Sequence, residues 1–294
     1  MALDELNKLI SDVEAHYDAD IYLISTMITD FIVDNVYFWV NSINNPNTHK
    51  NIILMLRTYG GSADAAYKIA RIFQTSYRTC EKSNSEQKKE DDPIFYLFVN
   101  GICKSAGTLI ATGADRYLLT DRAEFGPIDA QIRKPDEAGE RTSGLVTTGA
   151  FEPLQKQALE TFCEIFDHLR HDGNFGLSSR FAAEIANKLT VGLLSPVYAQ
   201  IDPHRVAELD RVLKIGAGYA ERLAHGNLKD GAIGLLLAGY PSHNFVIDRS
   251  EAENYLFKQV ESPIEQLVYL GNIFCSLDEN GFGRYHPIKV LNDD

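Results

Sequence analysis

Two glycine-containing junctions hold the residues of this chain whose types and spacing could do chemistry. The first reads RTYGGS over residues 57–62, and the second reads NGICKSAGTL over residues 100–109. The Gly-Gly pair of the first junction allows a sharp turn and leaves an amide N–H unobstructed, which suits a developing oxyanion where a helix begins. Taken alone, such a pair is also typical of a plain strand-to-helix turn.

Ser105, in the second junction, is the candidate nucleophile. A serine at the first turn of a helix is usually a cap. Here Ala106 and Gly107 are small, so they leave space around the serine and let the helix pack closely. The turn is similar in geometry to the nucleophile turn of serine hydrolases, but Cys103 stands where the GxSxG elbow has its first glycine. An α/β-hydrolase is therefore disfavoured.

Other catalytic signatures are absent from the sequence. It contains no P-loop, no GxGxxG motif after a strand and no HExxH motif. Its histidines, aspartates and cysteines do not gather at the spacing of metal ligands. We therefore expect neither a metal nor another cofactor.

The elements that must position these junctions alternate between strand and helix. Short apolar runs bounded by turn signals predict buried strands at residues 21–25, 51–57, 94–99 and 116–120. Helical patterns follow the first three of them, at 31–42, at 63–75 and from about Ser105 onward. This alternation predicts an α/β fold with a largely parallel sheet.

The second half of the chain is predicted to be mainly helical. Apolar residues recur on one helix face from 151 to 170, and Asp202-Pro203 is typical of the start of a helix that runs to about Leu223. Shorter helices are expected at 227–237, 250–257 and 263–275. The segment Cys80–Asp92 is polar and charged, and we interpret it as an exposed loop.

The bulk composition limits the compartment and the partners. The 294 residues carry a net charge of −13, which argues against broad binding to nucleic acid or to an anionic membrane. No signal peptide is visible, and charged residues interrupt the most apolar window, so no membrane span is expected. The cysteines form no CxxC pair and are widely spaced, which favours a reducing, cytoplasmic location: Cys80, Cys103, Cys163 and Cys275.

Taken together, three segments resemble the superfamily of Clp protease, signal peptide peptidase A and the serine dehydrogenase proteinase group. They read RTYGGSADAA at 57–66, KSAGTLIATGA at 104–114 and LLTDRAEFGPIDAQ at 118–131, and a weaker match lies at 239–260. KSAGTLIA and GPIDAQ are most similar to the serine dehydrogenase proteinase group. The resemblance implies a Clp-protease/crotonase-like spiral of repeated β-β-α units with a mostly parallel sheet and a helical C-terminal half. One domain is expected over residues 1–294, with a core of about 20–200 and a helical part of about 201–294.

The resemblance also assigns roles to residues. Ser105 matches the nucleophile, and the amides of Gly61 and Ala106 match the oxyanion hole. Clp proteases carry their histidine near Phe125-Gly126-Pro127, where this chain has none. His243 lies in a segment similar to the one that carries the Clp triad acid, and imidazole suits a general base near neutral pH.

Further candidate residues have alternative interpretations. Signal peptide peptidases use a lysine base, for which this chain offers Lys134 and Lys156, although Lys156 is also typical of a solvated helix face. Asp129 could orient the histidine or close a turn. Lys104 should point away from its neighbour Ser105, yet its charge could still favour the ionised serine.

The sequence therefore predicts a soluble serine endopeptidase that forms an acyl-enzyme on Ser105 and needs no ATP itself. We expect a protein or peptide substrate, a homo-oligomer and a possible regulatory protein partner. Two alternatives stay open. One is a crotonase-like acyl-CoA enzyme, which would not require a serine at 105, and the other is a pseudopeptidase that acts as a binding or scaffold protein. A membrane-anchored signal peptide peptidase is disfavoured, because no anchor is visible.

Overall fold

The contacts of the chain divide it into two compact units. The computed structural model describes residues 3–41, 49–76, 92–128, 131–133, 141–143, 151–172, 177–279 and 289–290. Unit 1 comprises Met1–Asp129 and Lys214–Asp294, and unit 2 comprises Ala130–Leu213. Contact units are not folding domains in themselves, so the expectation of one domain over 1–294 stays a prediction. The segment 77–91, which holds nearly all of the expected charged loop, lies outside the described residues.

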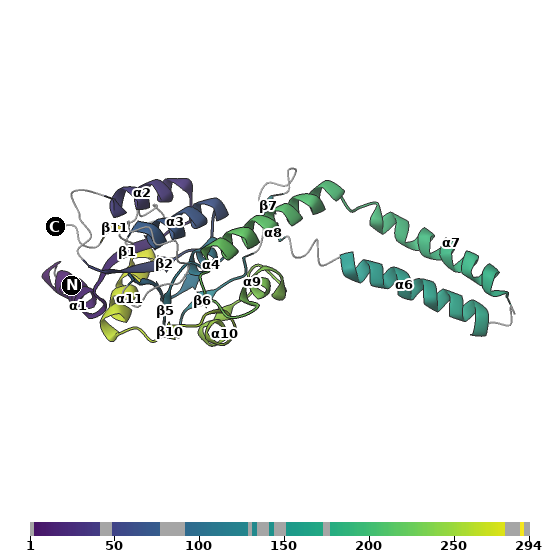
Figure 1. Ribbon diagram of the computed structural model, residues 1–294. Coiled ribbons are helices and arrows are strands. Elements are labelled where there is room, and N and C mark those ends of the chain that lie inside the picture. Colours follow the sequence, from purple (N-terminus) through teal and green to yellow (C-terminus); the bar gives the residue numbers. More distant parts are fainter. Residues whose placement is uncertain are drawn as a thin grey trace. The chain divides into compact units, whose positions relative to one another are not determined.

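A mostly parallel sheet is the centre of unit 1 (Figure 1). In the described part of the chain it has six strands in the order β10-β5-β3-β2-β1-β11. All neighbouring strands are parallel except the pair β1 and β11. The strands are β1 Ala19–Ser25, β2 Asn51–Arg57, β3 Phe95–Val99, β5 Arg116–Leu119, β10 Val260–Glu261 and β11 Lys289–Val290.

Helices cover both faces of this sheet, which is why its strands read as continuous apolar runs. Along β2, Ile52, Leu54 and Leu56 belong to the larger hydrophobic core, whereas Ile53 and Met55 belong to a smaller core on the other face. The helices α2 and α3 pack on the first face, and α1 and α11 on the second (Figure 1). Their bounds are α1 Leu3–Tyr17, α2 Asp30–Val40, α3 Ala63–Ser76 and α11 Glu265–Glu279.

A second layer of short strands lies beyond the carboxyl ends of the long ones. Its order is β4-β6-β9, with bounds β4 Ile102–Cys103, β6 Glu124–Phe125 and β9 Ile247–Asp248. Isolated bridges between Thr58 and Cys103 and between Ile28 and Gly61 extend it. After β1, β2 and β3 the chain thus makes a short extended stretch and then a helix. This confirms the mostly parallel α/β fold and the repeated β-β-α units that the sequence predicted.

Unit 2 is built around a pair of packed helices. They are α6 Phe151–Asp167, which a π-helical turn at His168–Asp172 extends, and α7 Ser179–Tyr198. Small α7 side chains, those of Ala182, Ala186 and Thr190, are buried at intervals of four residues. The strands β7 Gln131–Arg133 and β8 Arg141–Ser143 pair antiparallel.

The remaining helices connect unit 2 to unit 1 or follow within unit 1. Helix α8 Pro203–Leu223 begins in unit 2 and ends in unit 1, and its bounds agree with the helix predicted after Asp202-Pro203. The short elements α9 Ala232–Gly234 and α10 Arg249–Glu251 each continue into a π-helical turn. Among the residues that the structure describes, no helix is both long and apolar enough to cross a membrane.

Candidate active site

Ser105 is held in a strained conformation at the start of a buried helix. It precedes α4 Ala106–Ala111, all of whose residues are buried. Its backbone has φ 52° and ψ −110°, a region that residues other than glycine rarely adopt. Such a conformation costs on the order of 1–3 kcal/mol. Ser105 makes no side-chain cap hydrogen bond, so the ordinary role of a serine at a helix start does not explain it.

Backbone hydrogen bonds fix the chain just before Ser105. The amide of Thr58 donates to Ile102 O at 2.9 Å, and the amide of Lys104 donates to Thr58 O at 3.0 Å. These two bonds form the parallel bridge between Thr58 and Cys103. The second layer therefore determines where the chain enters the serine turn.

Thr108 fixes the chain just after Ser105. Its hydroxyl lies 3.0 Å from Cys103 O and 2.7 Å from Gly126 O, so it joins the first turn of α4 to the strands below it. Gly107 is needed for this packing, because a Cβ there would lie 2.6 Å from Thr58 Cγ2 and 3.0 Å from Cys103 Sγ. The small residues after the serine thus bring the helix close to the second layer, as the sequence suggested.

The Gly60–Gly61 turn lies directly against Ser105. A Cβ on Gly60 would lie 2.9 Å from Ser105 Cβ and 3.3 Å from Ser105 Oγ, and the φ of Gly60 is 126°. Thr58 Oγ1 orders the turn, since it lies 3.1 Å from both the nitrogen and the oxygen of Gly60. The sequence assigned a role to Gly61 but missed Gly60 and Thr58, although the Gly-Gly pair was a signal for the first.

The amides of Gly61 and Ala106 are available to a negatively charged oxygen. The bridge to Ile28 uses Gly60 O and the amide of Ser62, at 2.9 and 2.8 Å, and leaves the Gly61 N–H unused. Ala106 stands at the first helical position, where an amide has no acceptor within the helix. Within the described ranges, neither amide donates a hydrogen bond. Both belong to the immediate surroundings of Ser105.

Cys103 is not a competing nucleophile, although it lies two residues before Ser105. Its side chain is fully buried, and burial strongly raises the pKa of the thiol. A thiol must ionise to react, so Cys103 is inert in the folded protein.

The Lys104 ammonium contacts two groups outside the serine turn. Its ammonium lies 2.5 Å from Glu124 Oε1 and donates to Asn244 O at 3.3 Å. Glu124 belongs to β6, in the middle of the second layer. Nothing in the sequence indicated this partner.

His243 lies in the loop 240–246 that leads into β9. Tyr240 anchors the start of this loop, because its side chain is only 5% exposed and its ring lies 5.0 Å from that of Phe245. Burial, together with the nearby Glu251 carboxylate, raises the pKa of the Tyr240 hydroxyl. Asn244, the residue after His243, accepts the hydrogen bond from Lys104, so the loop reaches the residue that precedes Ser105.

Among the described residues, no hydrogen bond joins a basic side chain to the Ser105 hydroxyl. Asp129 and Lys134 lie outside the described residues. Lys156 belongs to unit 2, where its side chain is 76% exposed and lies 3.7 Å from Glu160, as expected for a solvated helix face.

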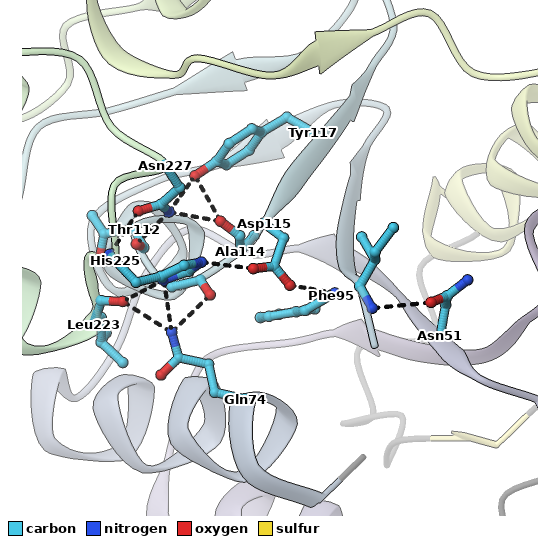
Figure 2. A network of polar contacts seen from close by, with 12 residues as sticks. Asn51, Gln74, Phe95, Thr112, Ala114, Asp115, Tyr117, Leu223, His225 and Asn227 are labelled. Carbon is cyan, nitrogen blue, oxygen red and sulfur yellow. Dashed lines mark hydrogen bonds and ion pairs between the residues drawn. The ribbon is translucent and has the colours of Figure 1, made fainter. Parts of the chain in front are cut away.

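A histidine–aspartate pair lies at the other end of α4. His225 Nε2 lies 2.6 Å from Asp115 Oδ1, and the Phe95 amide donates to Asp115 Oδ2 at 2.6 Å (Figure 2). Asn227 Nδ2 donates to Ala114 O and to the Tyr117 hydroxyl at 2.6 and 2.9 Å. The six-residue helix between this network and Ser105 is about 9 Å long. The pair therefore joins the segment after α4 to β3 and to the end of α8, away from Ser105, and the sequence gave no signal for it.

Comparisons with known proteins find distant similarities among solved structures. No family model and no curated protein matches the chain. Among solved structures, a serine-to-alanine mutant of the 1510-N membrane-bound stomatin-specific protease is 15% identical, with 94% of each chain covered and a TM-score of 0.38. A lysine-to-alanine mutant of that protease in complex with a substrate peptide is 16% identical, with 92% of this chain and 86% of that one covered and a TM-score of 0.39. At this level of similarity, the function has to be argued from Ser105 and the residues around it.

Proposed function

We propose that this protein is a serine peptidase with Ser105 as its nucleophile. The observation that carries the proposal is the serine itself, held at φ 52° without a capping bond while the backbone of Gly60 lies against its side chain. Residues in such strained conformations cluster at active sites, where the surrounding structure holds them in place. The unused amides of Gly61 and Ala106 supply the second requirement of acyl transfer, a site for the oxyanion.

The proposed reaction proceeds through an acyl-enzyme. His243 accepts the Ser105 proton as the oxygen attacks a peptide carbonyl carbon, and the carbonyl oxygen becomes an oxyanion between the two amides. The tetrahedral intermediate collapses, the C–N bond breaks, and the protonated base gives its proton to the leaving amine. Water then attacks the ester, and Ser105 recovers its proton. Asp129 is proposed to orient His243, and loss of one oxyanion donor lowers turnover about a hundredfold or more.

The substrate class, compartment, assembly and regulation of this peptidase are also proposals. We infer an endopeptidase that acts on protein or peptide substrates without ATP, in the cytoplasm, as a homo-oligomer and under the possible control of a partner protein. The resemblance of the three sequence segments supports the oligomer, and the net charge of −13 supports the absence of nucleic acid.

One observation favours a second candidate, a pseudopeptidase that binds without cleaving. In the described part of the chain, no basic side chain is hydrogen-bonded to the Ser105 hydroxyl. Catalytic hydrogen bonds are often long in the absence of substrate, so this geometry alone does not decide between the two.

Labelling with a fluorophosphonate probe tests the proposal. The wild type, Ser105→Ala and His243→Ala are incubated with the probe, and the adducts are measured by intact mass. We expect one adduct on the wild type, none on Ser105→Ala and strongly slowed labelling of His243→Ala. An unlabelled wild type would leave the pseudopeptidase as the better explanation. Equal labelling of the wild type and His243→Ala would transfer the base role to a lysine.

A further inference from the structure

Lys104 connects the strands of the second layer at the end where Ser105 lies. It follows β4 directly, its ammonium lies 2.5 Å from a carboxylate of Glu124 on β6, and it donates to the carbonyl of Asn244 three residues before β9. Its side chain is 14% exposed and that of Glu124 is 27% exposed. An ion pair this sheltered is screened less by water and salt than a surface pair.

The aliphatic part of Lys104 is also held in place. A Cβ on Gly126 would lie only 3.0–3.3 Å from the Cβ, Cγ and Cδ atoms of Lys104, so the lysine chain lies across the bare Cα of that glycine. The Lys104 amide is fixed by its bond to Thr58 O. The side chain therefore starts from a fixed backbone and follows a defined path to Glu124 and Asn244.

The loop 240–246 needs such a connection. Tyr240 is buried at its start, and the Phe245 amide donates to Ser242 O at 3.1 Å within the loop. These contacts shape the loop, but the bond from Lys104 to Asn244 O is what joins the residue next to His243 to the residue before Ser105.

We propose that Lys104 is a positioning residue that ties the His243 loop to the nucleophile turn through Asn244 O, with Glu124 holding its ammonium in place. This role rests on the proposed function, because it acts through His243 as the base. In this role Lys104 is neither the general base nor a direct activator of Ser105. Its donors face Glu124 and Asn244.

The test uses Lys104→Met, which keeps an unbranched side chain but removes the ammonium, in the full-length protein. Lys229→Met is the matched control, because Lys229 also donates to a backbone carbonyl, that of Asn254 at 3.0 Å, in another part of unit 1. Hydrogen exchange of the peptide that covers 240–246 reports on the tether. The rate of fluorophosphonate labelling at Ser105 reports on catalysis, and it is measured with and without His243→Ala.

We expect Lys104→Met to speed exchange in 240–246 and to slow labelling about tenfold or more, since small misplacements of a catalytic group have effects of this size. Lys229→Met should change neither. In the His243→Ala background, Lys104→Met should have no further effect on the labelling rate, because both changes then act through one group. A purely destabilising change would slow labelling in both backgrounds.

Three results would overturn the role of Lys104: unchanged exchange in 240–246, unchanged labelling of Lys104→Met, or an equal loss of rate in the His243→Ala background. A wild type that is never labelled is a different failure, since it refutes the proposed function. In that case the exchange measurement alone decides whether the tether exists, and a positioning role in catalysis is lost with the peptidase.

Discussion

Replacing Ser105 with glycine should make the protein more stable than replacing it with alanine. Ser105 has φ 52° and ψ −110°, which costs an L residue about 1–3 kcal/mol, and alanine keeps that strain because it keeps the Cβ. Glycine relieves it but has a more flexible unfolded state, which costs about 0.5–1 kcal/mol. The Ser105→Gly variant should thus exceed Ser105→Ala by up to about 2.5 kcal/mol in the free energy of unfolding.

The comparison with alanine removes the hydroxyl from both variants. The loss of the hydroxyl is therefore common to both variants and cancels in the difference between their free energies of unfolding. The hydroxyl also makes no capping hydrogen bond that its removal would break. Equilibrium unfolding in urea gives the midpoints and slopes of both variants. Asp18, the other described non-glycine residue with positive φ, at 46°, serves as a reference when it is also replaced by glycine and by alanine. If glycine stabilises at 18 but not at 105, the strain at Ser105 is not real.

Two further outcomes follow from the packing around the serine. Gly60→Ala should abolish fluorophosphonate labelling, because the added methyl group would meet Ser105. Gly101→Ala is the control and should retain labelling, since Gly101 also has a positive φ, 155°, but open space around it. Loss of labelling in both variants would point to a general backbone effect. Alkylation of the native protein at neutral pH should modify the exposed Cys163 but leave Cys103 unmodified, because burial raises the pKa of the Cys103 thiol. Peptide mass mapping identifies the modified cysteine. Rapid modification of Cys103 would contradict its burial.

The long strands were predictable because each is an apolar run with a turn at both ends. Strand β2 was expected at 51–57 and lies at Asn51–Arg57. Helix α1, Leu3–Tyr17, was not predicted from its acidic and mixed sequence. The short strands of the second layer were implied only by the resemblance, and the residue pattern did not locate them. A strand of two residues, such as β4 or β6, has no periodicity to detect, and only the pairing of distant segments defines it.

The turn around Ser105 was predictable because its residues are close together in the sequence, as small residues beside Ser105 and as a Gly-Gly pair. No local pattern indicated the partners of Lys104, because Glu124 and Asn244 lie 20 and 140 residues away and contact it only when the second layer forms. Whether His243 acts as the base stays a prediction. A general base is defined by its position relative to the nucleophile, and that position depends on a loop far along the chain.

The strain at Ser105 persists because α4 is fixed at both ends. A helix of six residues is too short to be stable alone, and it could otherwise shift to relax the serine. Thr108 fixes its first turn, while the buried Asn227 side chain fixes the segment after it through Thr112 O and Ala114 O (Figure 2). Hydrogen bonds of this kind are costly to leave unmade in a buried site. The residues that follow α8 therefore support the nucleophile from the far end of the helix that it begins.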